Sequence, residues 1–388
     1  MITIISNARC VRSSGLERVH LVIVREVIAA VLPGDRAIEG GYRALAEEVI
    51  DVGGAFVFPG LIDGHTHPLG AAGEAGPGTR APEIPAELFV RHGITTIVGM
   101  LGADDFSRSM AGLVSRIRAL RAAGLTAFSL SGSYRFPPAS LGPSVPWDLF
   151  FIPEVIGAGE IALSDVRSSA PTGAELRRFV QESLNAARLA GKRGVVLFHL
   201  GDEESGLRPV LELRTGSRLD CSRVIATHLN RNEQLMAEAP GAAAAGFWCD
   251  LTAIEFERFP SGFLPAEEGV ARLVATTPGI ERRLTVTSDC GTLVEGRYAT
   301  SPGSLLRAFR RNALDPAVGI ERAVRIYMEN PAECYGLTQK GVIAPGKDAD
   351  LIVADGELKV LEVFSGGKHL VRGGIVQPCE VLARSYND

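Results

Sequence analysis

The feature that most constrains the fold is an alternation between short β-branched runs and amphipathic stretches of helical length, from about residue 56 to residue 338. In the helical stretches, such as 107–124 and 172–192, apolar residues recur three and four positions apart, with Arg and Glu on the opposite face. Thr172 and Glu175 have the spacing of a capping box at the start of the second stretch. The eight predicted strands are 56–63, 94–100, 125–132, 155–163, 194–200, 223–229, 246–252 and 284–289.

Eight strand and helix units are what a (β/α)8 barrel requires, and a doubly wound open sheet is the main competitor. We favour an α/β fold with a TIM barrel over residues 56–338. Residues 1–55 and 339–388 instead read as short β segments separated by polar or Gly-containing turns. Each terminal segment is too short to fold alone, so we expect the two to pair into one discontinuous β-sandwich domain beside the barrel.

Composition narrows the class of protein. The 388 residues are 46% hydrophobic and carry a net charge of −5, without a run of five like charges, which disfavours a nucleic-acid or anionic-membrane partner. The apolar runs are shorter than the roughly 18 residues of a membrane span, and the N-terminus lacks the pattern of a secretory signal. We therefore expect a cytoplasmic protein. The six cysteines are scattered and form no CxxC pair, which disfavours disulfides and thiolate zinc sites.

Four of the seven histidines fall at the ends of predicted strands. His65 and His67 stand two residues apart after an apolar strand and should project to the same side. His199 and His228 come at the ends of two later strands, and Asp289 ends the eighth. A single histidine is more often a hydrogen-bonded structural residue than a ligand. Barrel enzymes, however, build their sites at the C-terminal ends of different strands, so the five residues together predict a site for zinc-type metal ions.

These positions resemble the pattern of the amidohydrolase superfamily: HxH after the first strand, a bridging ligand on the fourth, His on the fifth and sixth, and Asp on the eighth. Within the superfamily, essentially the whole chain resembles the isoaspartyl dipeptidase family. The HxH pair alone indicates only the superfamily, whereas the segments together are specific to the family. They are GEAGPGTRAPE (73–83), SGSY (131–134), SDVRSSAP (164–171), VVLFHLGD (195–202) and THLNRN (227–232), and GVIAPGKDADLIVAD (341–355) resembles the superfamily's return into its sandwich.

The resemblance implies two divalent metal ions, zinc in this family's pattern, held by imidazoles and carboxylates. The implied ligands are His65, His67 and Asp289 for the first ion, His199 and His228 for the second, and Glu160 between them. Here the chain departs from the family, whose better-known members carry a carboxylated lysine at the bridging position. A glutamate can bridge two cations with its two oxygens. Alternatively, Glu160 is an ordinary acid at a strand end, and the protein then has one metal or another bridge.

The resemblance also implies how a substrate is held. Glu74 would bind the substrate's α-ammonium group, and Arg167 and Arg231 would bind its carboxylates. Tyr134 would donate a hydrogen bond to the carbonyl oxygen. The family places a Ser shortly after the strand-eight Asp, and Thr292 could replace its hydroxyl group.

The expected function is cleavage of the isopeptide bond of β-aspartyl (isoaspartyl) dipeptides by a hydroxide that bridges the two ions, with Asp289 carrying the proton to the leaving amine. The substrate would be a small dipeptide, and the family pattern implies a homo-oligomer. A deaminase, lactonase or cyclic-amide hydrolase is the alternative within enzymes, because superfamily metal sites are widely reused. A catalytically inactive barrel kept as a binding protein is a third possibility.

Overall fold

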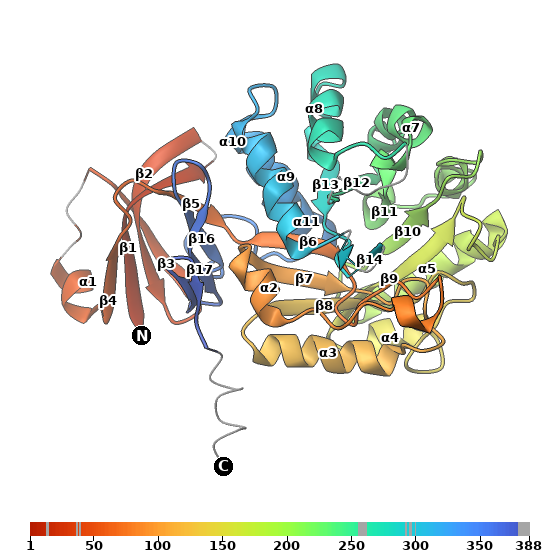
Figure 1. Ribbon diagram of the computed structural model, residues 1–388, viewed down its shortest axis with the longest axis horizontal. Helices are drawn as coiled ribbons and strands as arrows, with labels where there is room; N and C mark the ends of the chain where they lie inside the picture. Colours follow the sequence, from red (N-terminus) through yellow and green to blue (C-terminus); the bar gives the residue numbers. More distant parts are fainter. Residues whose placement is uncertain are drawn as a thin grey trace, which may run out of the picture.

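The computed structural model describes residues 1–12, 15–35, 38, 40–254, 262–291, 293–294, 297–298 and 300–378. Two sheets organise the described chain, one of eight strands and one of nine. A third sheet pairs only two short strands, β14 (Leu293–Val294) and β15 (Arg297–Tyr298). In Figure 1 the nine-stranded sheet lies to the left of the eight-stranded one, and the helices other than α1 (Gly40–Leu45) pack around the latter.

The eight-stranded sheet is a parallel barrel whose strands follow one another in chain order. At its two edges, the Asp289 amide donates to the His65 carbonyl oxygen at 3.0 Å, and Thr66 forms a parallel bridge with Cys290, so the barrel nearly closes. The predicted TIM barrel is confirmed, and the open doubly wound sheet is excluded. The strands are β6 (Leu61–Thr66), β7 (Ile94–Gly99), β8 (Thr126–Ser131), β9 (Val155–Leu163), β10 (Val196–Leu200), β11 (Val224–Thr227), β12 (Trp248–Thr252) and β13 (Leu284–Thr287).

Helices cover the outside of the barrel. The predicted capping box at Thr172 and Glu175 is present and starts the longest described helix, α5. No helix among the described residues is long and apolar enough to span a membrane. The helices of the barrel region are α2 (Ala86–Arg91), α3 (Met110–Ala122), α4 (Val145–Phe151), α5 (Gly173–Leu189), α6 (Arg208–Leu211), α7 (Glu233–Ala244), α8 (Ala266–Thr276), α9 (Pro302–Leu314), α10 (Gly319–Val324) and α11 (Asn330–Tyr335).

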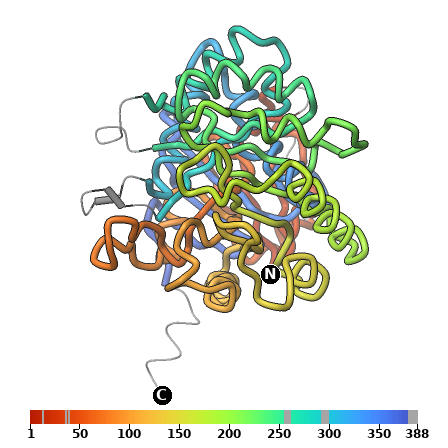
Figure 2. Tube along the Cα trace, turned by 90° about the vertical axis from the view of Figure 1, so that its right-hand side faces the viewer, coloured from red at the N-terminus to blue at the C-terminus, as the bar shows by residue number. Residues whose placement is uncertain are grey.

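The second sheet joins both ends of the chain, as predicted for the small sandwich domain. β5 pairs in parallel with β1 and antiparallel with β16, so the N- and C-terminal segments share one sheet and lie side by side in Figures 1 and 2. Helix α1 (Gly40–Leu45) is inserted between β3 and β4. The strands are β1 (Ile2–Arg12), β2 (Gly15–Val24), β3 (Val27–Pro33), β4 (Glu48–Asp51), β5 (Phe56–Pro59), β16 (Leu351–Ala354), β17 (Val360–Ser365), β18 (Lys368–Arg372) and β19 (Ile375–Val376).

One predicted strand, 56–63, is in fact two. The chain leaves the terminal sheet after β5 and enters the barrel at β6, with Gly60 between them. A Cβ atom on Gly60 would lie 2.1 Å from Thr95 Oγ1, so the crossing chain passes β7 too closely for any side chain. The apolar run continues through the break because both strands are buried, and periodicity therefore could not show the change of sheet.

Aromatic packing connects the terminal sheet to the barrel. The Phe58 side chain on β5 is only 1% exposed and packs edge-on against Phe309 of α9, with ring centroids 5.4 Å apart. Phe309 in turn contacts the ring of Tyr327 at 5.7 Å. A polar contact supports the same interface, because Lys340 Nζ donates to Thr126 Oγ1 of β8 at 2.7 Å.

We predict that Phe58→Ala lowers the free energy of unfolding by about 3–5 kcal/mol, because it leaves a cavity between the terminal sheet and the barrel. Urea titration followed by circular dichroism measures the loss. Phe106→Ala removes the same ring from a position that is 93% exposed and should leave the urea midpoint unchanged. Equal midpoints for the two variants would contradict this account of the interface.

Candidate active site

The C-terminal ends of five barrel strands bring the predicted metal ligands together. His65 lies in β6, Glu160 in β9 and His199 in β10, and the remaining three follow the ends of β6, β11 and β13. All have side chains with 0–4% exposure except Asp289, at 18%. The cluster consists of His65, His67, Glu160, His199, His228 and Asp289.

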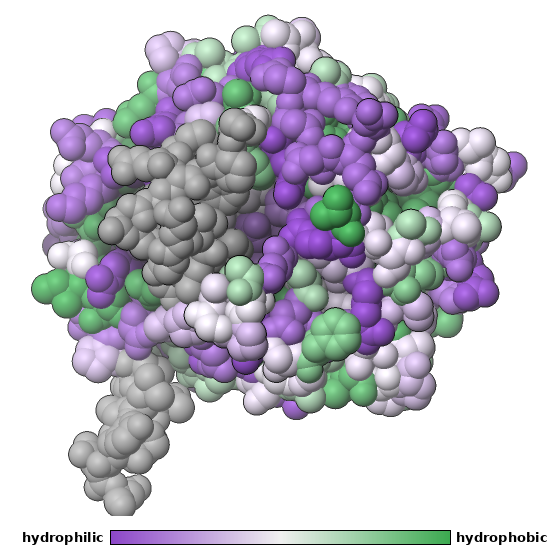
Figure 3. Space-filling model, turned by 45° about the vertical axis from the view of Figure 1, so that its right-hand side comes forward, coloured by the Kyte–Doolittle hydropathy of each residue, from purple (hydrophilic) through white to green (hydrophobic). Residues whose placement is uncertain are grey.

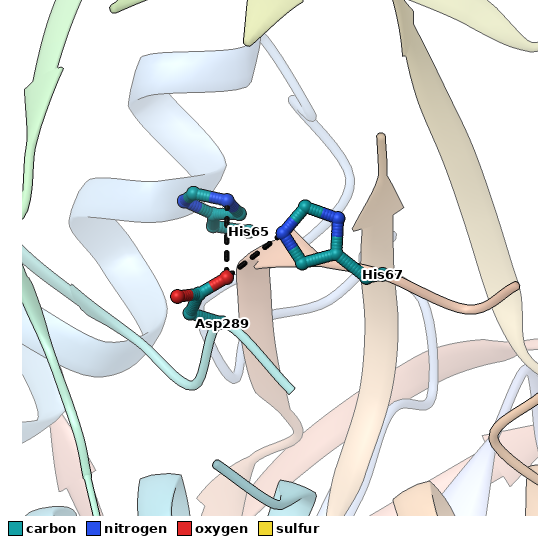
Figure 4. Close-up of side chains that lie close together, drawn as sticks. All are labelled: His65, His67 and Asp289. Atoms are coloured by element: carbon teal, nitrogen blue, oxygen red, sulfur yellow. Dashed lines mark ion pairs between the residues drawn. The ribbon is translucent and has the colours of Figure 1, made fainter. Parts of the chain in front are cut away.

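Asp289 and the HxH pair form the first group of possible ligands. Asp289 Oδ1 lies 2.9 Å from His67 Nε2 and 3.4 Å from His65 Nε2, and Figure 4 shows this one oxygen facing both rings. One possible ligand atom from each of the three residues lies within 4.8 Å of the other two, so a single ion could contact all three. The geometry therefore agrees with the first predicted metal position.

Glu160 faces this first group with one oxygen and the second group with the other. Its Oε2 lies 3.1 Å from His65 Nε2. Its Oε1 lies 2.7 Å from His199 Nδ1 and 3.3 Å from His228 Nε2. A carboxylate that contacts two histidine groups through separate oxygens has the arrangement that a bridge between two cations requires.

A β-bulge turns Glu160 into the barrel. Between β9 and β10, Ala158 pairs with Val196 and Ile161 with Phe198, so two residues on β9 oppose one on β10. Bulges re-aim side chains next to active sites. Gly159 permits the bulge, because its φ is +141° and a Cβ atom there would lie 2.7 Å from the Leu197 carbonyl oxygen.

Two of the cluster residues adopt left-handed backbone conformations just beyond their strands. His228 has φ +65° and Asp289 has φ +50°. The predicted strands 223–229 and 284–289 therefore end earlier, at Thr227 and Thr287. His and Asp tolerate this region better than most residues, and such conformations concentrate at functional sites.

Outer contacts fix which nitrogen of each ring faces the cluster. His67 Nδ1 lies 3.2 Å from the Met100 carbonyl oxygen, which accepts its proton, and His228 Nδ1 lies 2.6 Å from Thr252 Oγ1. Both Nε2 atoms are thereby left to act as ligands, as is usual for histidines that bind metals. His199 is held from the far side by Asp165, whose Oδ2 lies 3.0 Å from His199 Nε2.

Sequence reasoning missed Asp165 and a second acid, Asp250. Asp250 on β12 is buried and accepts hydrogen bonds from the hydroxyl groups of Thr227, Thr285 and Thr287. Thr227 Oγ1 also lies 3.4 Å from His65 Nδ1. The available signal was a carboxylate inside the apolar strand 246–252, because a buried acid needs partners.

The cluster's charges shift the pKa values of its members strongly. Burial by itself would lower the pKa of His65, but the carboxylates of Glu160 and Asp289 raise it to about 10. Burial would raise the pKa of Asp289, but His65 and His67 lower it to about 2. Burial and the neighbouring His199 lower the pKa of His228 to about 3. A positive charge is thus strongly favoured between the two carboxylates, in the place where a cation would bind.

This donor set fits divalent metal ions. Four imidazoles and two carboxylates converge, and two groups of three, His65 with His67 and Asp289 and His65 with Glu160 and His228, each have ligand atoms within 4.8 Å of one another. Imidazole and carboxylate together suit zinc and related first-row ions. The five described cysteines are free and buried, and none of them belongs to the cluster.

Of the predicted substrate-binding residues, three are in direct contact with the cluster or with each other. Tyr134 is half-buried, and its hydroxyl group lies 2.8 Å from His199 Nδ1. Arg167 NH2 lies 3.0 Å from His199 Nε2, and Arg167 NH1 donates to Glu74 Oε1 at 2.7 Å. Burial and the Glu160 carboxylate raise the pKa of Tyr134 well above its usual value, so the phenol keeps its proton.

The other two predicted residues are placed differently. Arg231 follows His228 by three residues and donates to Asp202 Oδ2 at 2.8 Å, and its guanidinium lies 5.7 Å from the ring centroid of Phe263. Thr292 lies outside the described residues. Hydrophilic side chains gather near the middle of the face shown in Figure 3.

Comparison with solved structures finds the same fold in an enzyme with a bound dipeptide. The β-aspartyl dipeptidase from Fervidobacterium islandicum AW-1, described as a complex with β-Asp-Leu, is 30% identical in sequence, with a TM-score of 0.88 over 97% of this chain and 99% of that chain. An L-hydantoinase from Arthrobacter aurescens shares the fold at 17% identity, with a TM-score of 0.68 and 97% of each chain covered.

Among curated proteins, adenine deaminase from Deinococcus radiodurans is 27% identical over 368 residues, which cover 92% of this chain and 61% of that protein. The chain thus spans about three fifths of the length of this relative. The model of the amidohydrolase family matches residues 266–376. With the barrel, its cluster and a 30% identical structural match along nearly its whole length, the chain belongs to the amidohydrolase superfamily, in the group of the β-aspartyl dipeptidases.

Proposed function

We propose that this protein is a binuclear-metal hydrolase that cleaves the isopeptide bond of β-aspartyl dipeptides. The observation that carries the proposal is the direct contact between the cluster and the charged groups outside it. Tyr134 and Arg167 both touch His199, and Arg167 also touches Glu74. A phenol and a guanidinium therefore contact a cluster residue directly, and a carboxylate contacts the guanidinium. The phenol suits the carbonyl group of such a dipeptide, the guanidinium its carboxylate group, and the carboxylate its ammonium group.

His65, His67 and Asp289 would hold one divalent ion, zinc by its donor set, and His199 and His228 the other, with Glu160 between them. When bound, the ions supply Lewis acidity, which makes hydroxide available near neutral pH and polarises a carbonyl group. Because Glu160 contacts histidines of both groups through separate oxygens, it would contribute a ligand atom to each of the two sites. Asp165 and Thr252 would hold the orientation of His199 and His228.

Asp289 is the group best placed to move the proton. Its side chain is the most exposed of the cluster, at 18%, and His65 and His67 lower its pKa to about 2 so that it is ionised at neutral pH. It would accept a proton from the attacking water and hand it to the leaving amine as the amide C–N bond breaks. Tyr134 would donate its proton in a hydrogen bond to the carbonyl oxygen as negative charge develops there.

Adenine deamination is the second candidate, because curated relatives at 27% identity have that name. Two observations favour the dipeptide. The structural match to the dipeptidase covers 99% of that chain, whereas the match to the deaminase covers 61% of that protein. The charged pair of Glu74 and Arg167 also suits a zwitterion, whereas adenine is neutral at pH 7.

We predict that the metal-loaded protein hydrolyses β-Asp-Leu with a kcat/KM at least about 100-fold above that for α-Asp-Leu, because the α-linked peptide cannot place its ammonium and carboxylate groups on Glu74 and Arg167 together with its amide at the cluster. Release of free leucine measures both reactions, and ammonia release from adenine is measured beside them. Chelation should abolish the activity and added Zn²⁺ should restore it. Equal turnover of the two peptides, or turnover of adenine alone, would refute the proposed specificity.

We predict that Glu160→Gln and Asp289→Asn each lower kcat for β-Asp-Leu by about 10²–10⁴-fold, because each removes a carboxylate from the cluster and Asp289→Asn also removes the proton carrier. Elemental analysis should find fewer than two metal ions per chain in Glu160→Gln. Glu154→Gln is the matched control. The Glu154 carboxylate pairs with Arg118 and contacts no cluster residue in the described structure. Wild-type kcat with two metals in both site variants would exclude the scheme.

A further inference from the structure

The Tyr134 side chain reaches the cluster from a loop and not from a strand. This loop, 132–144, follows β8 and leads to α4. Two backbone hydrogen bonds hold Tyr134 between the neighbouring strands. Its N–H donates to the Gly102 carbonyl oxygen beyond β7 at 3.2 Å, and its carbonyl oxygen accepts the Ala162 N–H of β9 at 3.1 Å. These bonds fix where the chain passes, but the direction of the phenol also depends on how the segment is rotated about its own axis.

One carboxylate binds the residues on both sides of Tyr134. Asp105 Oδ2 accepts the Ser133 hydroxyl group at 2.6 Å and also the Arg135 Nε–H. Because the two attachment points flank Tyr134, they restrict rotation of the segment between them. Asp105 itself lies in the loop after β7, and in the described structure its carboxylate contacts none of the six cluster residues. Any effect of Asp105 on the site is therefore exerted through the segment that carries Tyr134.

Burial makes the contact between Asp105 and Ser133 firm. The Asp105 side chain is 2% exposed, and Ser133 is fully buried. A buried carboxylate is unfavourable unless it is hydrogen-bonded, so Asp105 depends on these donors as much as they depend on it. Ser133 extends the connection, because its Oγ accepts the Ala139 backbone N–H at 3.2 Å. The Arg135 side chain is 53% exposed, so its ion pair contributes less.

A second acid holds the far end of the same loop. Asp148 of α4 is buried and accepts hydrogen bonds from the Ser131 hydroxyl group at 2.6 Å and from the backbone N–H groups of Leu141 and Gly142, both at 2.8 Å. The loop thus has one anchor for its end and another for the segment at the site. Removal of Asp105 should therefore release Tyr134 and leave the rest of the loop in place.

We propose that Asp105 is a positioning residue that aims the Tyr134 phenol at the reacting carbonyl group by binding both of its neighbours in the chain. The inference rests on the proposed function for the role of Tyr134, but the position of the phenol can be measured without turnover. The phenol assists the reaction only if it lies within hydrogen-bond distance of the oxygen on which negative charge develops. A displacement of about 1 Å is enough to lose much of that benefit.

Asp105→Ala removes the acceptor for both neighbours of Tyr134. For hydrolysis of β-Asp-Leu by the zinc-loaded protein, we expect kcat to fall about 10- to 100-fold. KM should stay within about twofold, because the phenol acts mainly in the transition state. In a Tyr134→Phe background the same change should lower kcat by less than about twofold, because no hydroxyl group remains to be positioned. A general loss of structure would instead lower kcat by the same factor in both backgrounds.

Fluorine NMR follows the phenol without a substrate. The chain has six tyrosines, which are labelled with 3-fluorotyrosine, and the signal missing from Tyr134→Phe is that of Tyr134. In zinc-loaded Asp105→Ala this signal should shift and broaden, whereas the other tyrosine signals stay in place. Asp105→Asn is nearly the same size as the wild-type side chain and keeps one oxygen as an acceptor. It should shift the signal by a smaller amount, and it carries the test if Asp105→Ala does not fold.

Asp220→Ala is the matched control. Asp220 accepts the same two kinds of donor, the Ser222 hydroxyl group at 2.6 Å and Arg223 Nε at 3.2 Å. It precedes β11 and therefore lies at the end of the barrel opposite to the cluster. Both kcat and the Tyr134 signal should keep their wild-type values in this variant.

The opposing outcomes are distinct. An equal loss of kcat in the wild-type and Tyr134→Phe backgrounds overturns the inference, as does a Tyr134 signal that stays unchanged in the Asp105 variants. A shifted signal in a protein whose wild type does not hydrolyse β-Asp-Leu rejects the proposed function and keeps the positioning of the phenol by Asp105. Hydrolysis with an unchanged signal keeps the proposed function and rejects the inference.

Discussion

The carboxylate of Glu160 is buried without any exposure to solvent, and the arrangement of the site follows from how that charge is compensated. An isolated buried carboxylate is very unfavourable unless it is paired and hydrogen-bonded. Here its contacts are imidazoles supplied by three other strands or their ends: His65, His199 and His228. The high pKa of His65 is the reciprocal effect, because the acids that need a cation hold a proton on the ring. The site is thus electrostatically prepared for positive charge.

That preparation depends on backbone conformations that an ideal barrel would not contain. The bulge at Gly159 aims Glu160 inward, and left-handed conformations at His228 and Asp289 place their side chains over the mouth. The two left-handed conformations are unfavourable locally and persist because the surrounding strands determine them. Asp250 contributes to that support, since three threonine hydroxyl groups from β11 and β13 bind its carboxylate below the cluster.

The periodicity of the chain was sufficient to predict the barrel, because eight buried strands between amphipathic helices leave few alternatives. The convergence of the five His and Asp residues of the cluster could be predicted for the same reason, since strand ends meet on one face of a barrel. The break at Gly60 could not be predicted, because both flanking strands are apolar and the cause is a close approach to Thr95, which is distant in sequence. Asp165 was missed because its contact with His199 depends on how the chain turns after β9. Thr292 lies outside the described residues, so its role stays a prediction.

The charged groups of the site differ in how deeply they are buried. The groups of the cluster are buried, whereas the groups proposed to bind the substrate are partly exposed. Coulomb energies are several times larger in a low-dielectric interior than near solvent. The contacts of Glu160 are fully buried, so the cluster cannot rearrange without a large loss of free energy. The pair of Glu74 and Arg167 is 56% and 29% exposed, so water screens it and it contributes little to the free energy of folding. Arg167 touches both regions, because Asp165 and His199 hold its inner face while Glu74 binds its outer face. Contacts at the outer face of Arg167 can therefore change without disturbing the buried side chains of the cluster.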